Sequence, residues 1–303
     1  MSHDFGAPIP LDPGEKPQNP AGTNKKWGPI ILEAERVARS YTTAVTLRQL
    51  HYRLVASSTG GYANKETDYT YLSKLTAEAR REGHFPSLSD TTRRVVTPSH
   101  FIGPEEALTA LADRFRLDRT RDQDYQVWVL FEKATLGAQV EAWTAAHGLP
   151  TAALRGYSSE SLEREVFDGM QDDGRPIVAF YIGDLDPEGE DIERNFLAQS
   201  ERQGVSFKHW ERLAVTPQQV TEYQLVANPG KPASTRATAF TQKHGRLFQI
   251  EAEAVDPGTL RTLVMNAIQD SSWFDHETWD QVKDDEALGR EQLQELADNW
   301  DSD

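Results

Sequence analysis

The sequence predicts an α/β protein in two parts, a helical N-terminal part followed by a parallel sheet covered by helices. Two observations carry this prediction. Across residues 29–82 the apolar side chains recur with the period of amphipathic helices. From Val127 onward, short continuous apolar runs alternate with segments of helical period, which is typical of buried parallel strands joined by helices. The 303 residues suffice for two domains with separate cores.

The composition excludes several kinds of site and compartment. The chain contains no cysteine, so disulfides, zinc–thiolate sites, iron–sulfur clusters and cysteine nucleophiles are excluded. The longest apolar runs, residues 127–131 and 177–182, fall far short of the ~20 residues that a membrane-spanning helix needs. Residues 1–20 lack the apolar centre of a signal peptide. We therefore expect a cytoplasmic protein with no membrane contact.

Charge is distributed unevenly along the chain. The formal net charge is −16, but residues 25–94 hold 12 basic against 7 acidic side chains, a local balance of +5. An acidic total argues weakly against nucleic-acid binding, whereas a basic region is where phosphate contacts would be made. Acidic residues gather after Ser271, which predicts an acidic helical tail over residues 271–303. This tail is either a solvated helix pair or an arm that mimics DNA and shields a basic groove.

Three helices are expected in the N-terminal part. Residues 1–24, with five prolines, predict a flexible leader. A first helix spans residues 29–41, with Pro29 in its first turn. Thr46 is a suitable N-cap for a second helix, in which Leu50 and Leu54 lie on the buried face. The third helix spans residues 71–82 and ends at Gly83.

The third helix is the basic one, with Lys74, Arg80 and Arg81 directed outward. A return rich in Pro, Ser and Thr follows over residues 86–98 and includes Arg93 and Arg94. Three short helices with a basic third one and such a return are typical of a winged-helix domain of the CAP-like kind. We expect this domain over residues 25–115, with these five basic residues contacting DNA.

The second part reads as a doubly covered parallel sheet over residues 122–270. Strands are expected at residues 127–131, 151–154, 177–182 and 205–213, separated by helices at residues 134–147, 161–170 and 191–202. The region after Leu247 shows a further helical pattern over residues 260–268 and no evident chemistry.

Acidic side chains follow two of the expected strands. Glu132 closes the first strand, while Asp184 and Asp186 follow the third. Since the carboxyl ends of parallel strands meet at one edge of a sheet, these three carboxylates should converge there. They would repel each other unless protonated or bridged by a hard dication, which predicts a Mg²⁺ or Mn²⁺ site. Taken singly, a strand-end Glu is usually a solvated cap and Asp-x-Asp is usually turn chemistry.

In combination, these acids resemble the Toprim domain of topoisomerases, primases and certain nucleases. That domain has one Glu after its first strand and Asp-x-Asp after a later strand. The segment Arg155-Gly156-Tyr157-Ser158-Ser159 resembles its glycine-bearing second strand end. The resemblance implies a Rossmann-like Toprim sheet with Glu132, Asp184 and Asp186 as metal ligands.

Arg48 and Tyr52 lie one turn apart on the second helix, at the flank of its buried face. On periodicity alone, Tyr52 is an amphipathic residue at the core edge with Arg48 stacked beside it. His51 points inward and is more simply a satisfied core residue than a base.

The second-helix segment resembles the Arg-x-x-x-Tyr helix of the topoisomerase VI A subunit and of the meiotic double-strand-break transesterase, in which a winged helix precedes Toprim. The resemblance covers residues 44–195 and includes two Toprim signatures in the family's order. These are Phe131-Glu132-Lys133 and Gly183-Asp184-Leu185-Asp186-Pro187-Glu188-Gly189. The chain is most similar to the compact A-like proteins of mobile elements, which lack an adjoining ATPase-type B subunit.

The resemblance implies an ATP-independent, type IIB-like DNA transesterase. Tyr52 would form a 5′-phosphotyrosyl link, Arg48 would hold the phosphate, and Glu132 would bind the metal and carry a proton. Lys133 would contact DNA. In this family the tyrosine and the metal site meet across a dimer, so a nucleoid-associated homodimer acting on double-stranded DNA is implied, with a B-type ATPase partner left open.

Two other functions stay open. One is a Toprim metal-dependent hydrolytic nuclease, like the nuclease subunit of Wadjet-type plasmid defence, which would not need Tyr52. The other is an inert DNA-binding module whose carboxylates bind a structural cation. A second basic island in residues 230–246 is either a DNA-groove contact or a solvated loop; its members are Lys231, Arg236, Lys243, His244 and Arg246.

Overall fold

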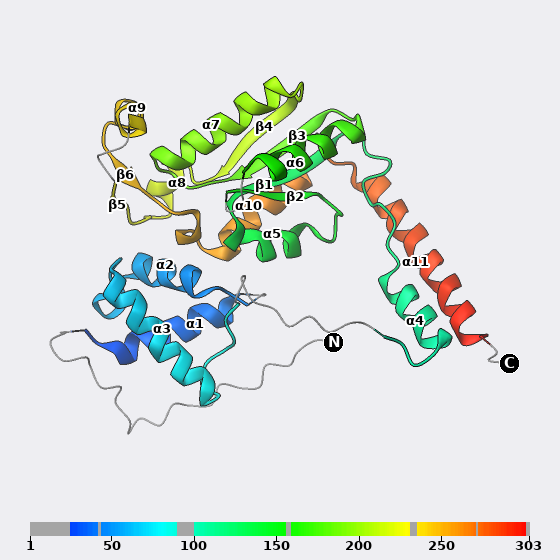
Figure 1. The fold of residues 1–303 in the computed structure, drawn as a ribbon, viewed down its shortest axis with the longest axis horizontal. Coiled ribbons are helices and arrows are strands. Elements are labelled where there is room, and N and C mark those ends of the chain that lie inside the picture. Colours follow the sequence, from blue (N-terminus) through cyan, green and yellow to red (C-terminus); the bar gives the residue numbers. More distant parts are fainter. Residues whose placement is uncertain are drawn as a thin grey trace.

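The computed structural model of the chain describes residues 25–41, 44–89, 100–155, 159–230, 235–270 and 272–300. Figure 1 shows a group of N-terminal helices, a sheet flanked by helices, and a helical arm that carries the C-terminus. The expected leader at residues 1–24, the basic residues Arg93, Arg94 and Lys231, and the segment 156–158 lie outside the described residues.

The N-terminal helices are α1 (Trp27–Ser40), α2 (Leu47–Ser57) and α3 (Glu66–Arg81), with a 3-10 turn η1 (Thr59–Gly61) between α2 and α3. Thr46 begins α2 as expected, because its hydroxyl accepts from the Gln49 amide and the Gln49 side chain accepts from the Thr46 amide. Helix α3 begins five residues before the expected start and ends before Gly83, whose φ is +78°. The core of these helices is apolar and includes Trp27, Ile30, Leu50, Leu54 and Leu72.

After α3, residues 86–88 belong to no helix or strand, and Ser89 forms an isolated parallel bridge with Thr46. The described residues thus contain the three helices of the expected winged helix, while most of the expected wing, residues 90–98, lies outside them.

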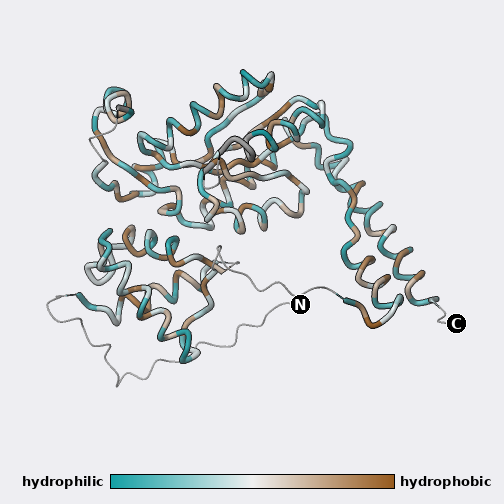
Figure 2. The backbone as a smooth tube through the Cα atoms, viewed as in Figure 1, coloured by the Kyte–Doolittle hydropathy of each residue, from teal (hydrophilic) through white to brown (hydrophobic). Residues whose placement is uncertain are grey.

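The sheet consists of β1 (Gln126–Lys133), β2 (Thr151–Arg155), β3 (Ile177–Ile182) and β4 (Phe207–Ala214), in the spatial order β2-β1-β3-β4. All neighbouring strands are parallel. The apolar runs of the sequence therefore predicted the strands correctly, and the α/β class is confirmed. Figure 2 shows apolar residues gathered along the central strands β1 and β3.

Helices cover both faces of the sheet. Side chains alternate between the two faces along each strand, and apolar side chains point to both, so each face needs a cover. On one face, Val129 and Phe131 pack with α5 (Gly137–Thr144) and α10 (Pro257–Gln269). On the other face, Leu130 and Tyr181 pack with α6 (Ser159–Asp173) and α7 (Pro187–Arg202). A 3-10 turn η2 (Ala134–Leu136) joins β1 to α5.

The chain between β4 and α10 forms an extension at the carboxyl edge of the sheet. It comprises α8 (Pro217–Glu222), β5 (Asn228–Pro229), α9 (Thr235–His244), β6 (Phe248–Gln249) and the 3-10 turn η3 (Ala252–Ala254). The strands β5 and β6 pair in antiparallel orientation, and Ile250 bridges to Leu185 after β3. This bridge brings η3 beside the strand end that carries Asp184.

The arm consists of α4 (Pro104–Arg114) and α11 (His276–Asp298), which lie side by side away from α1–α3 (Figure 1). A Cβ at Gly289 of α11 would stand 2.6 Å from the Phe115 ring, so only glycine allows this close approach. The structure departs here from the expected domain of residues 25–115, because α4 packs on the C-terminal helix instead of on α1–α3. The arm lies away from α3 (Figure 1).

Among the described residues, no helix combines the length and apolar character that crossing a membrane requires.

Candidate active site at the junction of the helical and sheet parts

The strand register places Glu132 at the carboxyl edge of the sheet beside the loop that follows β3. Phe131 pairs with Ile182, so Glu132 lies next to Gly183 and Asp184. Glu132 is 1% exposed, and its Oε2 accepts a hydrogen bond of 2.9 Å from the Asp184 amide. A Cβ at Gly189 would lie 2.9 Å from this oxygen. Glycine at that position therefore lets the first turn of α7 cover the carboxylate.

The pKa of Glu132 is raised to about 7. Burial is the main cause, and the negative charge of Asp184 adds to it, whereas the hydrogen bond from the Asp184 amide and the charge of Lys133 oppose it. Glu132 can therefore hold or release a proton at neutral pH. The sequence predicts that neighbouring carboxylates avoid repulsion either by protonation or by binding a dication. Protonation of Glu132 is the first of these two ways.

Asp184 uses both of its carboxylate oxygens within the chain. Oδ1 accepts from the Ala252 amide of η3 at 2.8 Å, and Oδ2 lies 2.6 Å from the Lys133 ammonium nitrogen. Asp184 is buried, so the lysine supplies the positive charge that an isolated buried carboxylate would lack.

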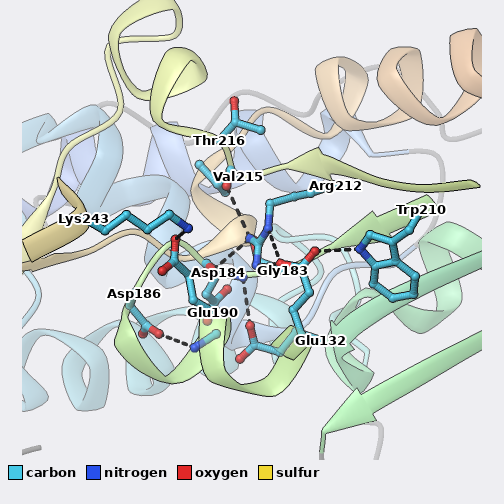
Figure 3. A network of polar contacts seen from close by, with 12 residues as sticks. Glu132, Gly183, Asp184, Asp186, Glu190, Trp210, Arg212, Val215, Thr216 and Lys243 are labelled. Atoms are coloured by element: carbon cyan, nitrogen blue, oxygen red, sulfur yellow. Dashed lines mark hydrogen bonds and ion pairs between the residues drawn. The ribbon is translucent and has the colours of Figure 1, made fainter. Parts of the chain in front are cut away.

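Asp186 caps α7, with its Oδ1 accepting from the Gly189 amide at 2.6 Å (Figure 3). Burial raises the pKa of Asp186, and the charge of Asp184 contributes. The charge of Asp184 thus raises the pKa of both Glu132 and Asp186, but the oxygens of the three expected ligands are directed to different partners. In the described part of the chain, no group of three or more acidic or histidine side chains is arranged to hold a metal ion.

Lys133 lies among carboxylates from two segments. Besides Asp184 it contacts Glu251, and the Oε2 of Glu253 lies 3.5 Å from its nitrogen. Glu253 is 3% exposed, and its Oε1 accepts from the Thr135 hydroxyl at 2.6 Å. Lys133 is expected from the sequence to contact DNA, and in the structure its ammonium group is paired with these carboxylates. We call this group the lysine cluster: Lys133, Asp184, Glu251 and Glu253.

Sequence reasoning missed Glu251 and Glu253, which belong to the region after Leu247 where no chemistry was recognised. One signal was available. Glu251 and Glu253 lie two residues apart between apolar residues, in the same alternation as Asp184 and Asp186.

Tyr52 lies beside the lysine cluster. Its hydroxyl accepts a hydrogen bond of 2.8 Å from the Arg48 guanidinium, and the Lys133 nitrogen lies 5.8 Å from the centre of its ring. Tyr52 is half-buried, whereas Arg48 is exposed. Burial raises the pKa of Tyr52, Arg48 opposes this shift, and the charges of Glu253 and Asp184 add to it.

Tyr52, Lys133 and Asp184 are brought together within one chain. The resemblance implied that the tyrosine and the carboxylates meet across a dimer, so this proximity differs from that expectation. His51, by contrast, lies where the sequence placed it. Its ring nitrogens bond the Tyr62 hydroxyl at 2.7 Å and the Asn64 carbonyl oxygen at 3.1 Å in the core, and burial lowers its pKa.

Arg212 holds the loop that carries Asp184. Its guanidinium donates to the carbonyls of Gly183 and Asp184, both at 3.1 Å (Figure 3). The same side chain pairs with Glu193 at 2.6 Å and lies over the Tyr181 ring. The loop is therefore fixed from the β4 side as well as from η3.

The expected DNA-contact residues have different surroundings. Lys74 and Arg81 are exposed on α3. Arg80 is half-buried, and burial together with the Arg81 charge lowers its pKa. The exposed surface of α3 thus carries Lys74 and Arg81 together with the acids Glu66 and Glu78.

In the second basic island, three side chains are paired with acids of α7. Lys243 and His244 both contact Glu190, at 2.9 and 2.7 Å, and Arg236 contacts Asp191 at 2.6 Å. Arg246 lies over the Phe248 ring. This island ties α9 to α7, which leaves less of its charge available for a phosphate backbone.

In comparisons with known proteins, no protein-family model matches the chain and no curated protein is detectably similar to it.

Proposed function

We propose that the chain is a DNA-cleaving transesterase in which Tyr52 attacks a phosphodiester, as in the type IIB topoisomerase A subunits that its motifs resemble. One observation supports this most: the Tyr52 hydroxyl accepts from Arg48 at 2.8 Å while its ring lies 5.8 Å from Lys133. A phenol with an exposed guanidinium at its hydroxyl and a second cation over its ring suits the approach of an anionic phosphate.

In the proposed step, the Tyr52 oxygen bonds to phosphorus while the bond from phosphorus to the 3′ oxygen breaks. Tyr52 loses its phenolic proton, the departing 3′ oxygen gains a proton, and the 5′ phosphate stays on the tyrosine. Since one phosphate ester replaces another, the reverse step can rejoin the strand without a further energy source.

Arg48 and Lys133 have distinct roles in this step. The raised pKa of Tyr52 keeps the phenol protonated at neutral pH, so the attack needs positive charge beside the oxygen as its proton leaves. Arg48 supplies this charge and can bind two phosphate oxygens. Lys133 supplies a second positive charge against the pentavalent phosphorus. Lys74 and Arg81 on α3 would contact the flanking duplex backbone.

We assign no step to a metal ion. Carboxylate oxygens are the donors that Mg²⁺ or Mn²⁺ prefers, so the residue types fit, but the arrangement of Glu132, Asp184 and Asp186 does not. Binding of either ion would require Asp184 to exchange Lys133 for the metal.

A hydrolytic nuclease is the second candidate, and one observation favours it. Glu132, with a pKa of about 7 beside Asp184, could accept a proton from an attacking water at neutral pH. Tyr52 would then be dispensable.

The test is cleavage of supercoiled plasmid in Mg²⁺ and in Mn²⁺, with products resolved before and after protease. We expect wild type to leave protein on 5′ ends and Tyr52→Phe to be at least ~100-fold slower. Tyr223→Phe, a half-buried tyrosine beyond α8, is the matched control and should cut like wild type. Cutting by Tyr52→Phe but not by Asp184→Asn would instead establish hydrolysis, and no cutting by wild type would leave the DNA-binding module.

A further inference from the structure

Polar contacts join the tyrosine helix to the sheet part within one chain. The Gln49 side-chain amide donates to the Thr135 carbonyl at 2.8 Å. Arg53 donates to the Ala254 carbonyl and to the Asp256 carboxylate, both at 3.0 Å. These contacts connect α2 with η2 on one side of Tyr52 and with η3 on the other.

The groups at the centre of this junction are buried and make their polar contacts within the same chain. Gln49 is 2% exposed, and its side chain both completes the cap of α2 and reaches Thr135. The Thr135 hydroxyl in turn donates to the buried Glu253, whose other oxygen faces Lys133. Buried polar groups that lose their partners destabilise a structure, so separation of α2 from this surface is opposed unless another surface supplies new partners.

The junction sets where Tyr52 lies. Leu50 and Leu54 fix one face of α2 in the N-terminal core, while Gln49 and Arg53 fix the neighbouring flank on the sheet part. Tyr52 is between Gln49 and Arg53 in the sequence, so its ring is held beside Lys133. Lys133 is held in turn by Asp184.

We infer that Tyr52 acts with Lys133 and Asp184 of its own chain, so that one chain is complete for cutting one DNA strand. This inference rests on the proposed function and specifies its product: a nick with one chain linked to its 5′ end. A dimer of this chain would carry two complete sites and would not share residues between them.

The first test mixes two inactive variants. Tyr52→Phe keeps the lysine cluster and Asp184→Asn keeps the tyrosine. If sites form within one chain, co-expressed and co-purified mixtures stay at least ~100-fold below wild type, like each variant alone. If sites form across two chains, a mixed dimer holds one intact site, so recovered nicking would overturn the inference. Mixtures that contain wild-type chain control for dominant inhibition.

The second test needs no activity. The chain contains no cysteine, so Arg53→Cys with Asp256→Cys introduces the only two thiols. A short bismaleimide is applied to a refolded mixture of ¹⁴N- and ¹⁵N-labelled chains. Links that join only equally labelled peptides support assembly within one chain, while mixed-label links or no link between these positions would overturn it. Single-cysteine variants control for folding.

The two tests separate the two claims. If wild-type protein does not cut and the links are confined to single chains, the proposed function is wrong but assembly of the site within one chain is supported. If wild-type protein cuts and the mixed variants recover nicking, the proposed function is supported but assembly of the site within one chain is wrong.

Discussion

Two glutamates, one at the sheet edge and one in the arm, are each 1% exposed, and their surroundings differ. Glu286 on α11 pairs with Arg119 and Arg290, both at 2.7 Å, and accepts from the Leu117 amide. Its pKa is lowered, chiefly by the hydrogen bonds from Arg119. Glu132 has a raised pKa, because burial and Asp184 outweigh the groups that favour its charge. A buried acid that is fully paired stabilises packing, whereas an under-compensated one is suited to chemistry.

The two regions should respond to pH in opposite directions. Folded Glu132 keeps its proton up to about pH 7, while an unfolded Glu releases it near 4.5, so its contribution to stability falls as pH rises through that window. His147 packs on Trp279 of the arm, and burial lowers its pKa from 6.5 to about 4. The unfolded chain then binds more protons, so this contribution falls as pH decreases from 6.5 towards 4.

The largest expected effect concerns the paired acid. Glu286→Gln removes the carboxylate that holds Arg119 and Arg290, and we expect the free energy of opening of α11 to fall by about 3 kcal/mol. Hydrogen exchange of the α11 amides measures this opening. Glu291→Gln, an exposed acid on the same helix, should change it by less than ~0.5 kcal/mol. Equal effects of the two substitutions would remove the distinction between the regions.

The second prediction concerns the under-compensated acid. Glu132→Gln abolishes an unfavourable buried charge, so we expect a gain of roughly 2 kcal/mol in unfolding free energy at pH 8 and little change at pH 4.5. Urea unfolding in EDTA measures the difference without a metal contribution. A loss of stability at pH 8 would mean that Glu132 is compensated in the folded chain after all.

The third prediction concerns acid sensitivity of the arm. His147→Phe keeps an aromatic ring against Trp279 and removes the titrating group, so α11 should gain roughly 1–2 kcal/mol at pH 5 relative to wild type. At pH 7 the two proteins should differ little. Tryptophan fluorescence followed from pH 7 to pH 4.5 measures the difference, and parallel acid transitions of both proteins would rule out this role of His147.

The smallest expected effect concerns Glu253, an intermediate case with one cation and one hydroxyl as partners. Glu253→Gln keeps an oxygen for Thr135 and weakens the hold on Lys133, so DNA cutting should slow by about tenfold. Affinity for DNA should stay unchanged. A double-mutant cycle with Lys133→Met tests whether Glu253 acts through Lys133. If it does, Glu253→Gln slows DNA cutting no further once Lys133 is replaced.

Much of the sheet edge could be predicted from the sequence. The apolar runs that became β1 and β3 are continuous, and parallel neighbours align their ends, so Glu132 and Asp184 had to be close. The side-chain period of two along a strand also indicates that Glu132 and Lys133 point to opposite faces of the sheet.

The position of Glu253 and the pairing of α4 with α11 could not be predicted, because they depend on contacts between residues distant in sequence. The extension strands β5 and β6 have two residues each, too few to give a periodic signal, so the position of Glu253 was not visible. The pairing of α4 with α11 likewise follows from the fit of Phe115 against Gly289, which no local pattern encodes.

The most direct test of the account is mass spectrometry of the protein after reaction with DNA and digestion by nuclease and trypsin. Trypsin releases residues 49–53, a pentapeptide that contains Tyr52. We predict that this peptide carries a nucleotide joined through its 5′ phosphate to the Tyr52 oxygen, and that the adduct is absent when Tyr52→Phe is used. Cut DNA with an unmodified peptide would contradict the account.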